Sequence, residues 1–227
     1  MVFSAFLNEH AEILRSLLEL YYPRTPKVKV IDLTYGKGHL WNIITDDPTL
    51  RRKYRVTACD AKPANRKVIK RNLLTDDYSN LGRHNAALFD PPYLINRVSF
   101  DYAKVGRNSW SADPNRKRYT ENQSLEEFNH RVECLSEKAH TFLKPNGLLF
   151  VKIMDPRRDG TLIPHHINVT RILSNRFELV DLAVYVRMGA TTWKIRGHIQ
   201  NLHGYWLVFK LKEAQENSCF PTDPGEV

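Results

Sequence analysis

Short apolar runs of strand length alternate with stretches of helical character along most of the chain. Strands are expected at residues 28–31, 55–59, 67–74, 86–89, 148–153, 178–187 and 204–211. Helices are expected at residues 4–20, 39–44, 125–142 and 163–174. Strands that alternate with helices form a mostly parallel sheet, which predicts an α/β fold. The last two strands have no helix between them and are expected to be antiparallel neighbours.

Local signals mark the ends of two of these helices. Ser124 and Glu127 have the spacing of a capping box directly before residues 125–142. Ser4 is a candidate N-cap for the first helix, and Pro23 is expected to stop that helix because proline has no N–H for the helical ladder.

Residues 94–123 interrupt the alternation of strands and helices. We expect a functional loop or lid, inserted in a single domain of residues 1–212 that is followed by a polar tail at residues 213–227. The basic residues of this loop are Arg97, Lys104, Arg107, Arg116, Lys117 and Arg118, and they are interleaved with Phe100, Tyr102, Trp110 and Tyr119. Positive charges among aromatic rings suit contacts to phosphates and stacking on bases.

The composition predicts a globular protein of a reducing compartment. The chain has 227 residues, of which 42% are hydrophobic and 11% aromatic, and this is enough for a sizeable core. An apolar run of about 18 residues and a secretory signal are both missing, so neither a membrane span nor export is expected. Cys59, Cys134 and Cys219 are few and widely spaced, which favours reduced thiols in a cytoplasmic protein.

The strand at residues 86–89 ends in Asp90-Pro91-Pro92-Tyr93. Two prolines cannot continue a sheet, so the chain leaves it at the carboxyl edge, where open α/β sheets bind ligands. Asp90 and the proline carbonyls are acceptors, and Tyr93 offers a flat face for stacking. This set suits a planar ligand with an exocyclic amine, whose N–H bonds are held so that the nitrogen lone pair points at an electrophile. A structural Pro-Pro turn with a surface tyrosine is the alternative.

A glycine turn that contains Gly36 and Gly38 follows the first strand, and its glycines let the backbone approach a ligand closely. A dinucleotide-binding turn would have a third glycine where Trp41 stands, which disfavours a nicotinamide dehydrogenase. Asp32 before the turn suits an ammonium group, and Asp60 after the second strand is placed to accept ribose hydroxyls. These features favour an aminoacyl nucleoside over NAD.

Two motifs in this order resemble those of the S-adenosylmethionine-dependent amino-methyltransferases: residues 32–38, which read D-L-T-Y-G-K-G, and residues 90–93, which read D-P-P-Y. That group includes adenine-N6 and cytosine-N4 DNA methyltransferases and some RNA enzymes that modify adenine N6 or guanine N2. The resemblance covers residues 28–211. It implies a Rossmann-like class I methyltransferase fold, with a seven-stranded mostly parallel sheet, an antiparallel last strand and helices on both faces.

The resemblance also implies roles for individual residues. S-adenosylmethionine would be the cofactor, with Asp60 on its ribose and Asn72 beside its adenine, where Asp76 is a rival. The methionine part would face Asp32, Thr34, Tyr35, Gly36 and Gly38. The catalytic turn that meets the target amine would consist of Asp90, Pro91, Pro92 and Tyr93.

Nucleic acid is the expected substrate, with adenine N6 of DNA as the methylated amine. The net charge is +9, from 34 Lys and Arg against 25 Asp and Glu, and it favours a polyanionic partner. Besides the basic loop, candidate contacts on other loops are Arg157, Arg158, His165, His166, Lys194, Arg196 and His198. The two adjacent histidines lack further ligands at suitable spacing, so no metal is expected.

Several alternatives stay open at this point. The substrate can be an RNA base, methylated at adenine N6 or guanine N2. The chain can also be an inactive nucleic-acid-binding subunit, although its intact motifs argue against that. No segment is large enough for a separate target-recognition domain, so either the recognised sequence is short or a second subunit reads it. A monomer or homodimer in the cytoplasm, associated with the nucleoid, is expected.

Overall fold

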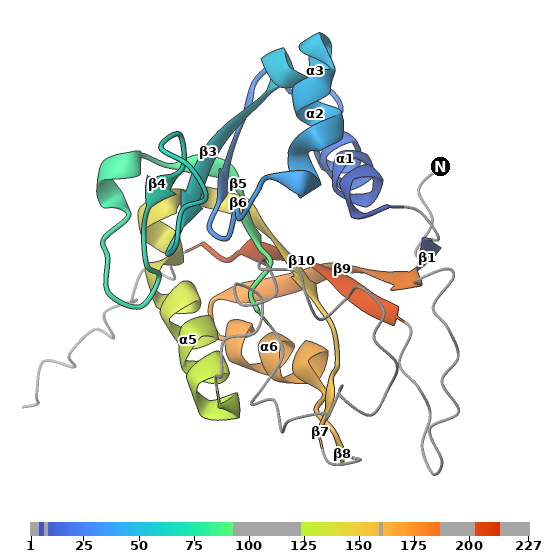
Figure 1. The fold of residues 1–227 in the computed structure, drawn as a ribbon, viewed down its shortest axis with the longest axis vertical. Helices are drawn as coiled ribbons and strands as arrows, with labels where there is room; N and C mark the ends of the chain where they lie inside the picture. The colour runs from blue at the N-terminus through green and yellow to red at the C-terminus, as the bar shows by residue number, and fades with distance from the viewer. Residues whose placement is uncertain (1–4, 7–8, 93–123, 159–160, 187–202, 214–227) are drawn as a thin grey trace, which may run out of the picture.

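A computed structural model of the chain describes residues 5–6, 9–92, 124–158, 161–186 and 203–213. An eight-stranded main sheet runs through the described part, and helices cover both of its faces (Figure 1). The α/β class predicted from the sequence is therefore confirmed.

The main sheet has the strand order β1-β9-β10-β6-β5-β2-β3-β4. β10 is antiparallel to both of its neighbours, and all other neighbouring strands are parallel. The seven expected strands are present with the reversed last strand, and β1 adds a short eighth strand at the edge. The bounds are β1 Ala5–Phe6, β2 Val28–Asp32, β3 Tyr54–Asp60, β4 Ile69–Lys70, β5 His84–Phe89, β6 Leu143–Ile153, β9 Phe177–Val186 and β10 His203–Leu211.

Helices α1, α2 and α3 cover one face of the sheet, and α5 and α6 cover the other (Figure 1). None of the described helices is long and apolar enough to cross a membrane. The bounds are α1 His10–Tyr21, η1 His39–Trp41, α2 Asn42–Asp46, α3 Pro48–Lys53, η2 Ser79–Leu81, α5 Leu125–Phe142 and α6 His165–Leu173. A short hairpin of β7 Arg157–Arg158 and β8 Thr161–Leu162 follows β6.

The capping box predicted for α5 is confirmed. Ser124 Oγ accepts a hydrogen bond from the Glu127 N–H at 3.0 Å, and Glu127 Oε2 accepts one from the Ser124 N–H at 2.6 Å. These bonds satisfy two donors that the first helical turn leaves without partners, so the helix begins at Leu125.

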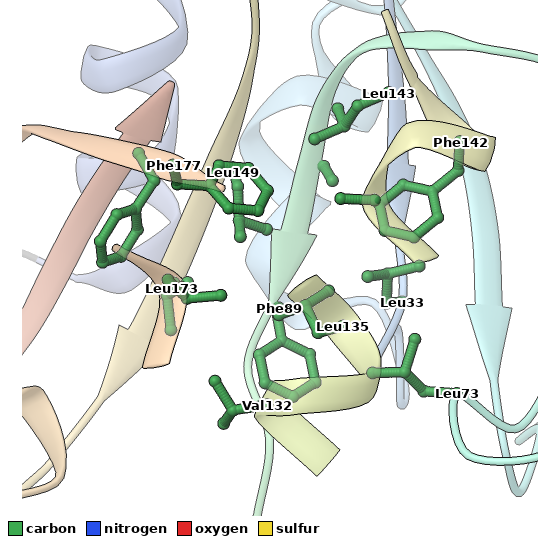
Figure 2. Close-up of a cluster of buried hydrophobic side chains, with 14 of the residues drawn as sticks. Leu33, Leu73, Phe89, Val132, Leu135, Phe142, Leu143, Leu149, Leu173 and Phe177 are labelled. Carbon is green, nitrogen blue, oxygen red and sulfur yellow. The ribbon is translucent and has the colours of Figure 1, made fainter. Parts of the chain in front are cut away.

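β5 is buried on both faces, so its apolar run does not alternate with polar residues. Ala86 and Leu88 pack on the side of α1, whereas Ala87 and Phe89 pack on the side of α5. Figure 2 shows Phe89 surrounded by apolar side chains of the hydrophobic cluster on the side of α5. Burial on both faces is typical of a central parallel strand. The centre of the sheet thus leads directly into the Asp-Pro-Pro turn at residues 90–92.

The first helix is shorter than expected. It begins at His10, because Ala5 and Phe6 pair with the edge strand β9 and cannot be helical. The prediction of Ser4 as the N-cap is therefore wrong; Glu9 occupies that position and makes no side-chain capping bond.

The strand expected at residues 67–74 is reduced to β4. The Asn72 side-chain oxygen accepts a hydrogen bond from the Leu74 N–H at 3.1 Å, and Asp76 Oδ2 accepts one from the Asn72 N–H at 2.9 Å. Such local side-chain bonds turn the backbone away from a sheet ladder. β6, in contrast, begins at Leu143, earlier than the expected residue 148.

Candidate active site

The two sequence motifs meet at the carboxyl edge of the sheet. β2 and β5 are parallel neighbours, with Asp32 in register with Leu88. Beyond this pair, the Leu33 N–H donates to the Leu88 carbonyl at 3.0 Å, and the Asp90 N–H donates to Thr34 Oγ1 at 2.7 Å. The glycine turn after β2 and the Asp-Pro-Pro turn after β5 are therefore joined by hydrogen bonds.

The glycine turn is held by residues at the end of β3. The Gly36 N–H donates to Asp60 Oδ2 at 2.8 Å, and the Tyr35 N–H donates to the Cys59 carbonyl at 2.9 Å. Gly36 and Gly38 have φ angles of 56° and 78°, in the left-handed region that favours glycine. A Cβ on Gly38 would lie 2.6 Å from Tyr35 Oη, so the tyrosine ring covers the turn in the space that glycine leaves.

We expect Gly38→Ala to destabilise the protein more in the wild-type chain than in a Tyr35→Ala background. Gly38 lies in the left-handed region, with φ 78° and ψ 15°, so alanine reduces the free energy of unfolding by about 1–2 kcal/mol in either background. A Cβ there forces the Tyr35 ring to move, at about 1 kcal/mol more, and Tyr35→Ala removes that clash. Urea unfolding of the wild type, the two single variants and the double variant measures this difference, and equal losses in the two backgrounds would contradict the contact.

Asp32 lies beneath the glycine turn and is only 1% exposed. Its Oδ2 accepts a hydrogen bond from Trp41 Nε1 at 2.6 Å, and its Oδ1 accepts one from the Thr34 N–H at 2.8 Å. Burial raises the pKa of this carboxyl to about 7, although both hydrogen bonds favour the ionised form. The Asp32 carboxylate is covered, lines neither cavity described below and organises the turn. A contact of Asp32 with a cofactor stays a prediction.

A cavity of about 100 Å³ opens beside the ends of β2, β3 and β5. Asp60 and Asn72 line it together with the apolar side chains of Leu73 and Phe89. Asp76 does not line this cavity. Its carboxylate accepts the Asn72 N–H at 2.9 Å, and this hydrogen bond lowers the pKa of Asp76. The structure therefore brings Asn72, but not its rival Asp76, to the cavity.

A second cavity, of about 470 Å³, adjoins the first. The residues that line both cavities are Thr34, Gly36, Asp90 and Pro92. The second cavity is further lined by Tyr35, Lys37, His39, Pro91, Lys152 and Tyr185, and by residues 9–11 at the start of α1. Asp90 is thus a charged group at the junction of the two cavities.

Lys152 of β6 forms an ion pair with Asp90. Its Nζ lies 3.0 Å from Asp90 Oδ1 and 2.8 Å from Oδ2, and the two side chains are 14% and 19% exposed. The register of β5 on β6 explains this ion pair. Phe89 is opposite Val151, so the residues that follow them, Asp90 and Lys152, lie side by side. Lys152 was not among the site residues predicted from the sequence, although a lysine inside the apolar run of residues 148–153 is a signal for such a residue.

His10 reaches the same site from α1 and was also missed. Its ring centroid lies 4.0 Å from that of Tyr185, and both residues line the second cavity. Burial and the nearby charge of Lys152 lower the pKa of His10 to about 3, so the imidazole is neutral near pH 7. Its Nδ1 has no hydrogen-bond partner among the described residues. The second cavity therefore combines a neutral imidazole with the Asp90–Lys152 pair.

Most of the expected substrate contacts lie outside the described residues. They are Tyr93, Arg97, Lys104, Arg107, Arg116, Lys117, Arg118, Lys194, Arg196 and His198. Cys59 and Cys134 are buried free thiols, and Cys219 lies outside the described part.

The histidine pair of α6 does not form the expected basic rim. His165 is fully buried, with its ring centroid 4.2 Å from that of Phe128, so its place in the rim is wrong. His166 Nδ1 lies 2.5 Å from Asp155 Oδ2, and the His166 ring stacks on Tyr205 at 4.3 Å. In the part of the chain that the structure describes, no three His, Cys, Asp or Glu side chains are grouped as metal ligands.

Comparisons with known proteins give one family match. A family model for N6 and N4 methyltransferases, described as DNA methylase, matches residues 85–222. A comparison with curated proteins gives no match.

Solved structures with a similar fold are methyltransferases. The 1,6-didemethyltoxoflavin-N1-methyltransferase of Burkholderia thailandensis, solved with 1,6-didemethyltoxoflavin and S-adenosylhomocysteine, is 14% identical over 90% of this chain and 79% of that chain, with a TM-score of 0.52. A Listeria monocytogenes protein assigned to the class I S-adenosylmethionine-dependent methyltransferases is 14% identical over 92% of this chain and 62% of that chain, with a TM-score of 0.51. At this identity the likeness concerns the fold alone.

Proposed function

Since the chain belongs to the N6/N4 DNA methylase family, we propose that it transfers a methyl group from S-adenosylmethionine to adenine N6 in DNA. The family and the class I methyltransferase fold make S-adenosylmethionine the cofactor and nucleic acid the substrate class. The observation that best supports the proposal is the position of Asp90. Its N–H donates a hydrogen bond to Thr34 of the glycine turn, and Asp90 lines both cavities at their junction.

The described residues fit this cofactor. The Asp60 carboxylate and the Asn72 side chain line the first cavity, and Leu73 and Phe89 add the apolar surface that suits a purine ring. We assign Asp60 to the ribose and Asn72 to the adenine edge, with the glycine turn facing the methionine part. When bound, S-adenosylmethionine supplies an electrophilic methyl group and leaves as S-adenosylhomocysteine.

Asp90 and the Pro91 carbonyl are the acceptors that we propose for the target amine. Both residues line the second cavity, where Lys152 fixes the Asp90 carboxylate through two short contacts. Acceptors on both N–H bonds orient the nitrogen lone pair and stabilise the positive charge that develops on nitrogen during transfer. Asp90 is also the carboxylate placed to accept the proton that the nitrogen then loses. Alignment and electrostatics, rather than a strong base, provide the catalysis.

Adenine in duplex DNA has to leave the base stack before its amine can reach Asp90. Extrusion costs a few kcal/mol, which stacking and phosphate contacts offset. We propose Tyr93 as the stacking partner and the basic residues of the 94–123 loop, with Lys194 and Arg196, as phosphate contacts. The net charge of +9 supports such contacts.

A methyl-transfer assay tests the proposed function. The protein is incubated with S-adenosylmethionine that carries a labelled methyl group and with unmethylated plasmid DNA, total RNA or a protein mixture, and the labelled pool is digested to its monomers. We expect N6-methyldeoxyadenosine. Label in N4-methyldeoxycytidine or in RNA would overturn the proposed base or polymer. Cofactor binding without any transfer would identify an inactive subunit.

We expect Asp60→Ala to weaken S-adenosylmethionine binding by about ten- to a hundredfold, because hydrogen bonds to a charged group contribute about 1.5–3 kcal/mol. Asp60 also accepts the Gly36 N–H, so the variant loses a bond of the turn as well. Asp47→Ala is the matched control, since that carboxylate also accepts a backbone N–H, from Thr49 at 2.7 Å, but lines neither cavity. Titration calorimetry compares the two, and unchanged affinity in Asp60→Ala would refute the ribose assignment.

A further inference from the structure

The amino-terminal edge of the sheet, opposite the active site, carries a cluster of basic side chains. β2, β3 and β5 all begin at this edge, because they are parallel neighbours. Figure 1 shows α3 leading into the start of β3 there. We use the name basic edge for Lys27, Lys29, Lys53, Arg55, Arg83 and Lys144.

Two of these residues, Lys29 and Lys144, contact Asn85, Lys29 through its backbone and Lys144 through its side chain. The Lys29 N–H donates to Asn85 Oδ1 at 3.0 Å, and Lys144 Nζ donates to the same oxygen at 3.4 Å. Arg55 is in register with Lys29 on the neighbouring strand. The charges of Lys29 and Lys144 add to burial in lowering the pKa of His84. The positive charges of Lys29 and Lys144 thus act on one small region at the start of β5.

The basic edge is open to solvent and poor in neutralising partners. All of its residues are exposed except Lys53, which is half-buried with its Nζ 3.4 Å from the Pro23 carbonyl. Within the described ranges, none of its six side chains forms an ion pair with a carboxylate. Glu213 is instead hydrogen-bonded to Asn146 Nδ2 at 2.6 Å. Exposed charges of one sign that lack counter-charges attract polyanions.

The basic edge also lacks the apolar anchors of a protein interface. The exposed large hydrophobic side chains in the described part of the chain lie on α1, α5, β8, α6 and β9, outside the strands β2, β3 and β5 that begin at the basic edge; they are Leu20, Leu125, Leu162, Ile167, Leu179 and Val180. Stable protein interfaces are usually centred on aromatic or aliphatic anchors. Cations without such anchors therefore favour nucleic-acid phosphates over an acidic protein.

The two edges of the sheet are separated by the length of its strands, on the order of 20 Å for β3. A straight DNA segment docked at Asp90 cannot also lie along Lys29 and Lys144. We therefore propose that the basic edge binds the phosphate backbone of a second segment of nucleic acid while the first occupies the active site. The inference rests on the proposed function only in taking nucleic acid as the substrate.

A bridging experiment tests this second site. Two unmethylated duplexes of about 15 base pairs, roughly 50 Å long, carry a donor and an acceptor dye and are mixed with the full chain. The wild-type protein should bring them together and give energy transfer. Lys29→Ala/Lys144→Ala should weaken binding of the second duplex at least tenfold and lower its log–log salt slope by about 2, because each phosphate contact contributes about 0.9. Methylation of a single duplex should stay unchanged.

The matched control is Arg66→Ala/Lys67→Ala, which removes the same charge from exposed positions outside both cavities. Equal effects of the two variants, or bridging that survives in Lys29→Ala/Lys144→Ala, would overturn the second site. Binding of polyglutamate but not of a second duplex would identify an acidic protein partner and would also overturn it. If bridging depends on the basic edge but no methylation occurs, the second site stands and only the proposed function is contradicted.

Discussion

Replacing Asp90 by alanine is expected to reduce methyl transfer by about a thousandfold or more, while the affinity for S-adenosylmethionine changes by less than about threefold. Removal of one preorganised group that stabilises developing charge typically costs a factor of about 10²–10³, and Asp90 would in addition be the proton acceptor. Cofactor binding should persist because Asp60 and Asn72 line the first cavity independently of the Asp90 carboxylate. Single-turnover transfer of labelled methyl groups and titration calorimetry measure the two quantities.

Asp90→Asn is the informative companion of this variant. An asparagine keeps a carbonyl acceptor at the same place, so transfer should fall less than in Asp90→Ala. Both variants leave Lys152 without its carboxylate partner, so thermal unfolding has to show that the folded fraction is the same at the assay temperature. Parallel loss of transfer and of cofactor binding in Asp90→Ala would contradict a role of this carboxylate in the chemistry.

The central strands and their functional ends could be predicted because both depend on local sequence. A strand buried on both faces is a continuous apolar run, and β5 has one that ends where two prolines make continuation of the ladder impossible. Asp60 was found in the same way, as an acid directly after an apolar run. Parallel strands then bring their carboxyl ends to one edge, so spacing along the chain predicted that Asp60 and Asp90 line a common site.

The remaining features depend on partners that are distant in the sequence. Residues 5–6 have a helical pattern, but pairing with β9 makes them a strand. Asp32 precedes the glycine turn, but its burial and its hydrogen bond from Trp41 could not be predicted from the local sequence. Lys152 became recognisable only through the register of β6 on β5. Propensity cannot supply such information, because tertiary contacts decide which of several local preferences is realised.

The charges around the Asp-Pro-Pro turn at residues 90–92 act on one another. Asp90 forms an ion pair with Lys152, and the positive charge of Lys152 also contributes to the low pKa of His10. An ion pair with a lysine fixes the orientation of a carboxylate, so its remaining lone pairs point in defined directions. An isolated surface aspartate lacks this constraint. We therefore propose that Lys152 is a positioning residue, whose effect on transfer passes through Asp90.

Lys152→Met is therefore expected to lower methyl transfer by about a hundredfold, whereas Asp90→Asn/Lys152→Met should transfer no more slowly than Asp90→Asn alone. Methionine keeps the volume of the lysine stem but leaves the Asp90 carboxylate, 19% exposed, without its cation, and an unpaired buried charge costs several kcal/mol. A neutral asparagine needs no such partner, so the effects of the two substitutions on transfer should not add.

Nuclear magnetic resonance of His10 provides a readout that is independent of activity. The pKa of His10 should rise from about 3 when the lysine charge is removed, since burial alone then lowers it. Additive losses in the double variant, or an unchanged His10 titration, would show that Lys152 acts elsewhere.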